Sequence, residues 1–165
     1  MYNVIQMIHQ LYVCFLLKYQ STSIDIYYHS YTSNLQIGFH IYGKLKPATR
    51  GAFDVTELVR VQEARQELYF TASPDNPTQR YLYRTSFRGH GLERLTPTNA
   101  PGTHKYVASP DGRWAFHTVS SFTVPPKTEL ISLPDHKTVR VLADNQKIRE
   151  KLATLKVPTT EFFRV

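Results

Sequence analysis

The sequence is short of the residues that active sites and metal centres use most often. Among 165 residues there is a single cysteine, Cys14, which excludes an internal disulfide framework and a cysteine-based zinc site and leaves the redox compartment open. There is no Gly-x-Ser-x-Gly, the pattern whose small residues let a strained turn expose a catalytic serine. No Gly-rich phosphate loop is present either. We therefore expect no catalytic residue, no metal site and no cofactor.

Histidine does not fill the gap that cysteine leaves. The chain has seven histidines, but none forms a His-x-His or His-x-x-x-His pair, so their spacing predicts no zinc site. Gly89-His90-Gly91 is interpreted as the tip of a connection between strands. We expect four histidines in loops or on the faces of sheets, namely His90, His104, His117 and His136.

Long apolar runs and clustered charges are also missing. The longest apolar run, Leu11 to Leu17, is too short to cross a bilayer, so no membrane span is predicted. No Lys or Arg precedes it and no small-residue cleavage site follows it, so no secretory signal is predicted and the localisation is left unknown. The net charge is +7, but Lys and Arg alternate with Asp and Glu between residues 127 and 151. This mixture is typical of a solvated surface, and we expect no nucleic acid as partner.

Strand-forming residues, in contrast, are plentiful. Aromatic residues make up 13% of the chain and apolar residues 41%, which is enough for a core. Short apolar runs bounded by turn residues predict an all-β protein. The expected strands are Ile24 to His29, Leu35 to Tyr42, Asp54 to Val61, Glu67 to Ser73, Arg80 to Phe87, Glu93 to Thr96, Lys105 to Ser109, Arg113 to Ser121, Thr128 to Leu133 and Thr138 to Leu142.

The strand-like runs repeat with a nearly constant period. Three pairs of starts are 46, 48 and 46 residues apart (113−67, 128−80 and 139−93). A weaker third copy sets Leu35 to Tyr42 against Arg80 to Phe87 and Thr49 against Thr96, with offsets of 45 and 47. A period in this range, filled by four short strands, is typical of β-propeller blades. We therefore predict a partial β-propeller of two to three four-stranded blades.

Two turns and one helix complete the expected fold. Ser109-Pro110-Asp111-Gly112 predicts a hairpin between the first and second strands of a blade, and Ser73 to Pro77 a turn between the second and third strands of the preceding copy. A short helix near the C-terminus is predicted from about Gln146 to Lys156, with Asp144 or Asn145 as N-cap. Its apolar stripe is interpreted as a packing face made by Ile148, Leu152 and Leu155.

Three aromatic groups could form a binding platform, yet in a propeller such residues usually fill the space between blades. We therefore expect Trp114 and the pairs Tyr69-Phe70 and Phe162-Phe163 to belong to the core.

Several segments between Gly51 and Val165 match a known pattern. They are Gly51 to Thr56, Leu68 to Ala72, Pro77, Arg80 to Tyr83, Leu95-Thr96, Ser109 to Gly112, and finally Val139 to Leu142 with Asp144-Asn145 and the helix up to Val157-Pro158. On these residues the sequence resembles the end of the propeller domain in the dipeptidyl peptidase IV family of serine peptidases. The last segment is the most specific, because in that family such a strand, helix and proline unit leads from the last full blade toward a hydrolase domain.

The resemblance implies a domain organisation. Residues 35–165 would be a partial propeller domain, Thr160 to Phe163 would enter the linker to an α/β-hydrolase domain, and residues 1–34 stay unassigned. In the family the Ser-Asp-His triad lies in the hydrolase domain, and the acidic pair that holds the substrate's amino terminus lies earlier in the propeller. Neither region matches this chain, so the resemblance assigns no catalytic, cofactor-binding or metal residue here.

The resemblance also implies a function. Intact members release N-terminal X-Pro dipeptides from peptides and are typically periplasmic, secreted or membrane-anchored. This chain would supply blades for structure and substrate gating, as a fragment that is inactive alone. An alternative is a stand-alone protein-interaction module, which a sharp, reversible melt of a monomer would favour. An open set of blades exposes strand edges and sheet faces, so self-association through them is expected.

Overall fold

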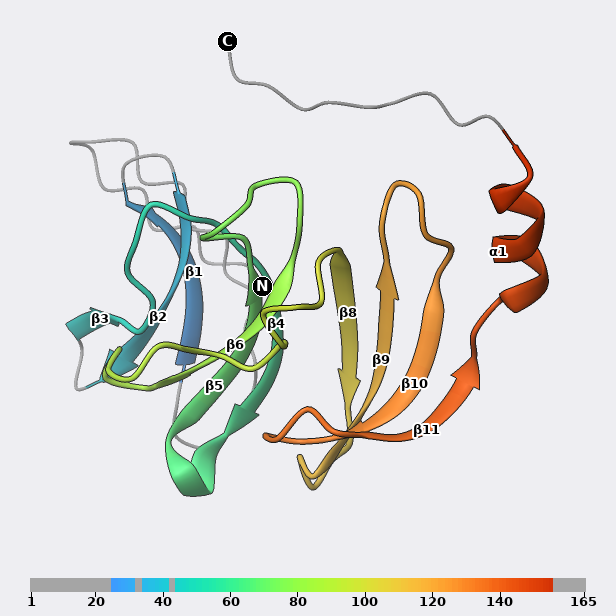
Figure 1. The fold of residues 1–165 in the computed structure, drawn as a ribbon. Coiled ribbons are helices and arrows are strands. Elements are labelled where there is room, and N and C mark those ends of the chain that lie inside the picture. The colour runs from blue at the N-terminus through green and yellow to red at the C-terminus, as the bar shows by residue number, and fades with distance from the viewer. Residues whose placement is uncertain (1–24, 32–33, 42–43, 156–165) are drawn as a thin grey trace, which may run out of the picture.

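Three antiparallel sheets lie side by side in the computed structural model, which describes residues 25–31, 34–41 and 44–155 (Figure 1). The first sheet has the order β1-β2-β3, with β1 at Asp25–Tyr31, β2 at Asn34–Ile41 and β3 at Lys44–Pro47. The second sheet has the order β4-β5-β6-β7, formed by Val55–Gln62, Glu67–Ala72, Tyr81–Ser86 and Glu93–Arg94. The last sheet has the order β11-β10-β9-β8, and its strands in chain order are Thr103–Ala108, Trp114–Ser120, Lys127–Ser132 and Thr138–Ala143.

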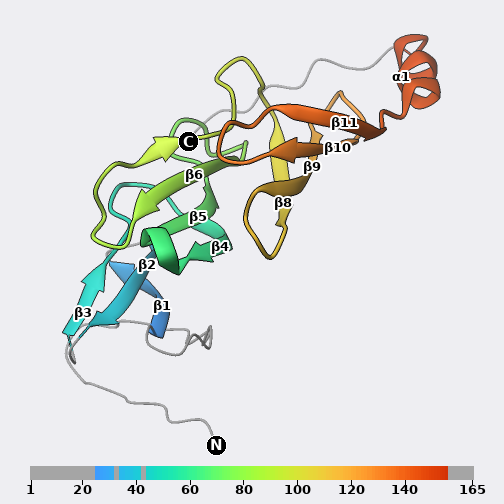
Figure 2. The same cartoon turned by 90° about the horizontal axis from the view of Figure 1, so that it is seen from below.

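The view from below shows the same open row of sheets, with the helix α1 (Gln146–Ala153) beyond the last sheet (Figure 2). A 3-10 helix at Glu63–Arg65 joins β4 to β5. The sheets do not close into a barrel within the described residues. The prediction of an all-β, partial propeller with one short helix near the C-terminus is confirmed, with two four-stranded blades and a third sheet of three strands.

All ten expected strands are present, and the structure adds one. The additional strand, β3 at Lys44–Pro47, pairs with β2 at the edge of the first sheet. Its sequence has two lysines and a proline, residues that suit an edge strand and hide the usual strand signal. The predicted strand Glu93 to Thr96 is shorter in the structure, because the amides of Leu95 and Thr96 both turn toward the Leu82 carbonyl, at 2.8 and 3.4 Å.

The 47-residue spacing of Thr49 and Thr96 reflects a repeated structure. Each threonine is buried after the last strand of its sheet, and its hydroxyl oxygen accepts a hydrogen bond from a strand amide. The Ile37 amide donates to Thr49 and the Leu82 amide to Thr96, both over 2.8 Å. The edge strand stops one residue pair short of each amide, since β3 ends opposite Gly38 and β7 ends opposite Tyr83. The threonine hydroxyl therefore satisfies a buried donor. The same closure therefore ends two successive blades.

The first and second sheets share an apolar core. Its members come from both sheets and include the stacked rings of Phe70 and Tyr83 and the contact of Phe39 with Phe87, whose centroids lie 4.6 Å apart. The buried residues are Ile37, Phe39, Ala48, Phe53, Val55, Val61, Leu68, Phe70, Ala72, Tyr81, Tyr83 and Phe87. Burial of this set supplies the hydrophobic stabilisation that holds these two blades together.

Both predicted turns are confirmed. Ser109 to Gly112 connects β8 to β9, and the Gly112 amide donates to the Ser109 carbonyl over 2.9 Å. Gly112 has a φ of +69°, which glycine adopts without the steric penalty of a Cβ atom. Ser73 to Pro77 connects β5 to β6, the second and third strands of their sheet.

The helix α1 starts at Gln146 as predicted but ends at Ala153, and one of the two candidate residues caps its start. Asp144 caps it, since its carboxylate accepts from the Gln146 amide over 3.1 Å, whereas Asn145 makes no side-chain cap. The predicted packing face is wrong for the part of the chain that the structure describes: no residue of α1 is buried, and Ile148 and Leu155 are 52% and 56% exposed. The helix lies past β11, where no described element covers it (Figure 1).

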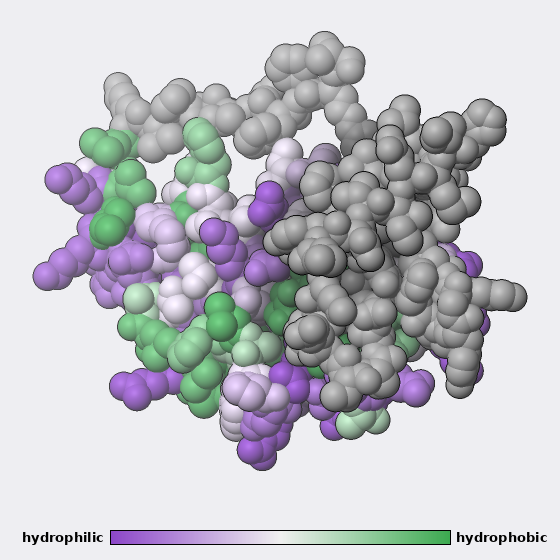
Figure 3. Space-filling view, turned by 180° about the vertical axis from the view of Figure 1, so that it is seen from behind, coloured by the Kyte–Doolittle hydropathy of each residue, from purple (hydrophilic) through white to green (hydrophobic). Residues whose placement is uncertain are grey.

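The outer face of the last sheet, the face turned away from the second sheet, is exposed and apolar. Figure 3 shows apolar side chains at the surface on the side of the molecule formed by this sheet. An open groove of about 600 Å³ runs over this face. The larger apolar side chains that line it are those of Val107, Pro110, Trp114, Phe116, Leu130 and Val139. The prediction that Trp114 belongs to the core is therefore wrong for the described residues, because its side chain lies on this outer face.

Candidate functional site: the contact between the second and last sheets

The backbone joins the second and last sheets at one point. Arg80, just before β6, forms an isolated parallel bridge with Thr103 at the start of β8. The Arg80 amide donates to the Gly102 carbonyl over 3.2 Å, and the His104 amide donates to the Arg80 carbonyl over 3.0 Å. Gly102 has a φ of +140°, and a Cβ atom there would lie 2.7 Å from the Ser120 carbonyl oxygen. The chain that leads into β8 therefore requires glycine here, where it lies against the end of the neighbouring strand β9.

Apolar side chains extend the contact away from the bridge. Tyr69 and Leu82 of the second sheet pack with four residues of the last sheet and the turn after it, namely Tyr106, Ala115, Ile131 and Leu133. The expected burial of the pair Tyr69-Phe70 is confirmed, and the two residues point to opposite faces: Phe70 packs toward the first sheet and Tyr69 toward the last. This is the alternation that a β-strand imposes.

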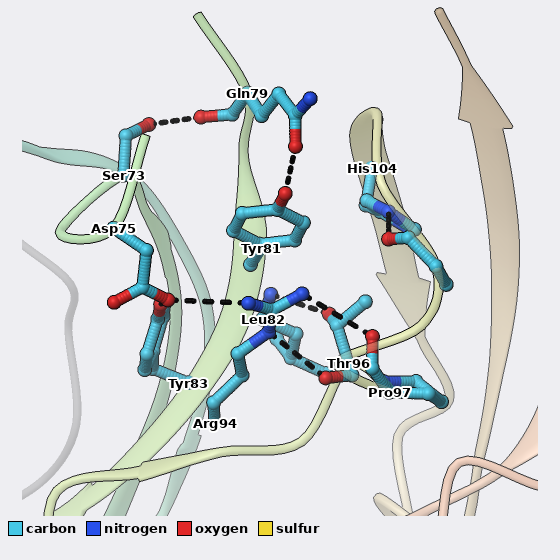
Figure 4. Close-up of polar contacts among 11 residues, drawn as sticks. Ser73, Asp75, Gln79, Tyr81, Leu82, Tyr83, Arg94, Thr96, Pro97 and His104 are labelled. Carbon is cyan, nitrogen blue, oxygen red and sulfur yellow. Dashed lines mark hydrogen bonds and ion pairs between the residues drawn. The ribbon is translucent and has the colours of Figure 1, made fainter. Parts of the chain in front are cut away.

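Arg94 organises the loop that leads from the second sheet to the last (Figure 4). Its guanidinium carbon lies 3.6 Å from the centre of the Tyr81 ring, a cation–π contact. It donates to the carbonyls of Thr96 and Pro97 over 3.0 and 3.2 Å, and it pairs with Asp75 over 3.1 Å. Planar guanidinium can satisfy several acceptors at once, so one side chain fixes the chain between residues 94 and 97.

Further polar contacts tie the β5–β6 turn to this arginine (Figure 4). The Tyr83 hydroxyl donates to Asp75 over 3.1 Å. The pKa of Tyr83 is raised mainly by burial and also by the neighbouring Asp75 carboxylate. The backbone carbonyl of Gln79 accepts a hydrogen bond from the Ser73 hydroxyl, and the side-chain amide oxygen of Gln79 accepts one from the Tyr81 hydroxyl. The turn is therefore held by its own side chains and by Arg94.

A second polar group lies deeper in the contact. The Thr96 hydroxyl and the Tyr106 hydroxyl are 2.8 Å apart, and the Tyr106 hydroxyl also lies 2.8 Å from Nε2 of His136. Burial raises the pKa of Tyr106 and lowers the pKa of His136. Thr96 thus closes the second blade and at the same time bonds to the last one.

Two buried histidines form the centre of this group. Nδ1 of His104 lies 2.8 Å from Nε2 of His117, and the two rings are stacked 5.1 Å apart. Nδ1 of His117 lies 3.1 Å from the Glu129 carboxylate, whose other oxygen pairs with Lys127 over 2.7 Å. Burial, and then the charge of a neighbouring histidine, lowers the pKa of both His104 and His117 to about 4. Both rings are therefore neutral at pH 7.

Glu129 remains ionised beside these rings. Burial alone would raise its pKa, but the ion pair with Lys127 and the contact with His117 outweigh that effect and hold the pKa below its ordinary value. A carboxylate, an ammonium group and two neutral imidazoles thus share one side of the last sheet. This arrangement was not found from sequence, where the four histidines were expected only in loops or on sheet faces.

The structure places the four singled-out histidines differently from one another. His104 and His117 lie on β8 and β9 and are 1% and 2% exposed, His136 lies in the turn before β11, and His90 is exposed in a loop. One signal could have found the pair: His104 and Tyr106 share a strand face by alternation, as do Ala115 and His117. Phe162-Phe163 and Cys14 lie outside the described residues.

Within residues 25–31, 34–41 and 44–155 no group of three or more His, Cys, Asp or Glu side chains could hold a metal ion. The helix in this part of the chain is also not long and apolar enough to cross a membrane. The site is a polar and apolar contact between two blades.

The sheets, their repeated closure and their stacking define a segment of a β-propeller. Comparison of the sequence with family models places it further: residues 8–126 match the dipeptidyl peptidase IV (DPP IV) N-terminal region. The chain belongs to this family. The match begins ahead of residue 35, where the sequence predicted the domain to start, and it ends before the strand, helix and proline unit of residues 139–158.

Individual relatives agree with the family. The chain is 25% identical over 142 residues to a probable dipeptidyl peptidase 4 of Aspergillus flavus, covering 86% of this chain and 18% of the relative. It is 29% identical over 117 residues to a probable dipeptidyl-aminopeptidase B of Emericella nidulans, covering 69% of this chain and 13% of the relative. The chain therefore spans less than a fifth of the length of these relatives.

Two solved structures have a similar fold. The crystal structure of Porphyromonas gingivalis dipeptidyl peptidase 4 matches with a TM-score of 0.72 and 24% identity, over 83% of this chain and 19% of that chain. A putative dipeptidyl aminopeptidase IV from Bacteroides ovatus matches with a TM-score of 0.60 and 16% identity, over 79% of this chain and 21% of that one. The arrangement of the sheets is thus similar to that in about a fifth of each of these two solved chains.

Proposed function

We propose that this chain supplies blades of a dipeptidyl peptidase IV-like propeller, where they give structure and restrict the access of peptide substrates. Residues 35–165 would form the partial propeller domain, ending at the start of a linker to a hydrolase domain. In this account the chemistry that releases N-terminal X-Pro dipeptides resides outside the chain, which carries no catalytic residue. The family match and the blade stacking support the proposal.

One observation carries the proposal: two aromatic residues at equivalent positions of successive blades differ in whether another sheet covers them. Strands β5 and β9 start 47 residues apart (114−67), which sets Tyr69 against Phe116. Tyr69 lies on the face of the second sheet that is turned toward the last sheet, and Phe116 lies on the corresponding face of the last sheet. Tyr69 is 4% exposed because the last sheet covers it, whereas Phe116 is 53% exposed. The outer face of the last sheet is therefore built for a further four-stranded sheet.

The uncovered face also supports self-association of the isolated chain. Contiguous exposed apolar surface marks an interaction site, and strand β11 is an edge strand of the sheet among the described residues. A second copy could cover part of this face when the natural neighbour is absent.

The experiment that tests the proposed role is hydrolysis of a chromogenic Gly-Pro reporter by the purified chain. No turnover above the buffer blank is expected, since the Gly-x-Ser-x-Gly pattern that exposes a catalytic serine is absent. A purified dipeptidyl peptidase serves as positive control. Turnover that follows the chain through two different chromatography steps and scales with its concentration would contradict the proposal.

A further inference from the structure

Four groups between the last two blades form a continuous series of short polar contacts. Both ends of the series are hydrogen-bond acceptors, a backbone carbonyl at one end and a carboxylate at the other. The Ala100 carbonyl oxygen lies 3.0 Å from Nε2 of His104, the two imidazoles approach to 2.8 Å, and His117 lies 3.1 Å from the Glu129 carboxylate. All three distances lie in the range of hydrogen bonds. Each hydrogen bond requires one proton between its two atoms.

The number of protons does not match the number of contacts. A carbonyl and a carboxylate only accept, and a neutral imidazole carries one ring proton. Neutral His104 and His117 therefore provide two protons for three contacts. Whichever tautomers the rings adopt, at least one contact sets two lone pairs against each other: at Ala100, between the rings, or at Glu129.

We propose that the series Ala100–His104–His117–Glu129 is a binding site for a single proton, one proton short at neutral pH and completed when that proton binds. The added proton becomes the third ring N–H of the pair, so that one imidazole is an imidazolium that donates from both nitrogens. All three contacts are then hydrogen bonds, and no bond in the series is left between two acceptors.

The surrounding charges limit the site to one proton. Lys127, on the same strand as Glu129, keeps the carboxylate ionised from its other oxygen. Arg94 lies over Tyr81, whose ring packs against His104 with centroids 5.5 Å apart. A second imidazolium would face the first ring at 2.8 Å, in a site where burial already lowers the pKa of both rings. The remaining neighbours are the ring of His136, whose edge lies against His117, and the hydroxyl of Tyr106.

The position of the site gives the proton a structural effect. Its members come from β8, β9, β10 and the loop before β8, so the proton bonds three adjacent strands of the last sheet through their side chains. His104 also stacks on Tyr81 of the second sheet. The binding of a proton is thereby coupled to the packing of the last blade on the one before it.

The substitution Glu129→Gln tests this inference, because the amide of glutamine can supply the missing proton. Its N–H group would donate to Nδ1 of His117, His117 to His104, and His104 to the Ala100 carbonyl, all with neutral rings. The variant loses the charge opposite Lys127, yet Tm at pH 7.5 should rise by about 3 °C over the unsubstituted chain. Glu129→Met has a similar volume and also loses the Lys127 partner, but it donates no proton, and its Tm should fall.

The tautomers of the two histidine rings provide a second test, because a change in stability alone would not alter which ring nitrogens carry protons. Long-range 1H–15N spectra of the histidine rings at pH 7.5 should show Glu129→Gln with His104 and His117 both protonated on Nε2. On acidification the unsubstituted pair should take up one proton before unfolding. A Tm of Glu129→Gln at or below that of Glu129→Met, or two protons taken up independently by the folded pair, would overturn the inference.

Discussion

Lowering the pH from 7 to 4 should destabilise the folded chain by several kcal/mol. Burial lowers the pKa of His104 and His117 from 6.5 to about 4. Between these values the unfolded chain binds protons that the folded chain does not. The stability from the neutral rings is therefore complete above pH 6.5 and is lost as the pH falls through this window. At about 1.4 kcal/mol per pKa unit, each ring accounts for up to about 3 kcal/mol.

Urea unfolding followed by circular dichroism at pH 7, 6, 5 and 4 would measure this loss. His117→Gln removes one of the two buried rings and should reduce the difference in unfolding free energy between pH 7 and pH 4 by about half. His90→Gln, a change at an exposed loop position, is the matched control and should leave the difference unchanged. An unfolding free energy that is constant between pH 7 and pH 4 would show that the two rings are not buried as neutral groups.

Tyr69→Ala should cost about 3 kcal/mol or more, whereas Phe116→Ala should leave the stability of the monomer within about 0.5 kcal/mol. The two rings occupy equivalent positions on successive blades, but the last sheet covers only Tyr69. Truncation of a buried aromatic side chain loses its transfer free energy and leaves a cavity, while truncation of an exposed one does neither.

Chemical denaturation of both variants at a concentration low enough to avoid association would measure the difference. The comparison is internally controlled, because both changes remove an aromatic ring from the same position of a blade. Equal losses from the two substitutions would mean that Phe116 is covered in the isolated chain, and the assignment of an open outer face would fail.

The sequence predicted the repeat and the family because both depend on local signals. The Ser109 to Gly112 turn, the spacing of Thr49 and Thr96 and the strand runs are properties of short segments, and each is found in the structure. The edge strand β3 was missed since its Lys and Pro residues carry no period-two apolar pattern.

Trp114 was expected in the core because aromatic residues usually fill the space between blades. The offset of 46 between the predicted strand starts would also set Trp114 against Leu68, which faces the core of the first two sheets. The observed strands start 47 residues apart, so Trp114 corresponds to Glu67 instead. Because side chains alternate along a strand, a shift of one residue moves every side chain to the other face. Periodicity alone does not fix the offset to a single residue.

The histidine pair was missed for a different reason. His104 and His117 come together because β8 pairs with β9 in a register that sets Tyr106 against His117 and His104 against Val119. No spacing rule for metal sites or catalysis describes two rings that meet across a hairpin and end on a buried carboxylate. The partner Glu129 arrives from a third strand. Such contacts follow from the sheet as a whole and not from any one segment.

Sedimentation velocity of the isolated chain tests the central claim, that the outer face of the last sheet is a face for packing another sheet. The chain should sediment as larger species with rising concentration, because uncovered apolar faces associate. A variant with Phe116→Lys and Val139→Lys, both at exposed positions of this face, should sediment as a monomer over the same range. An unsubstituted chain that remains a monomer at every concentration, with the same sedimentation coefficient as the variant, would contradict the account.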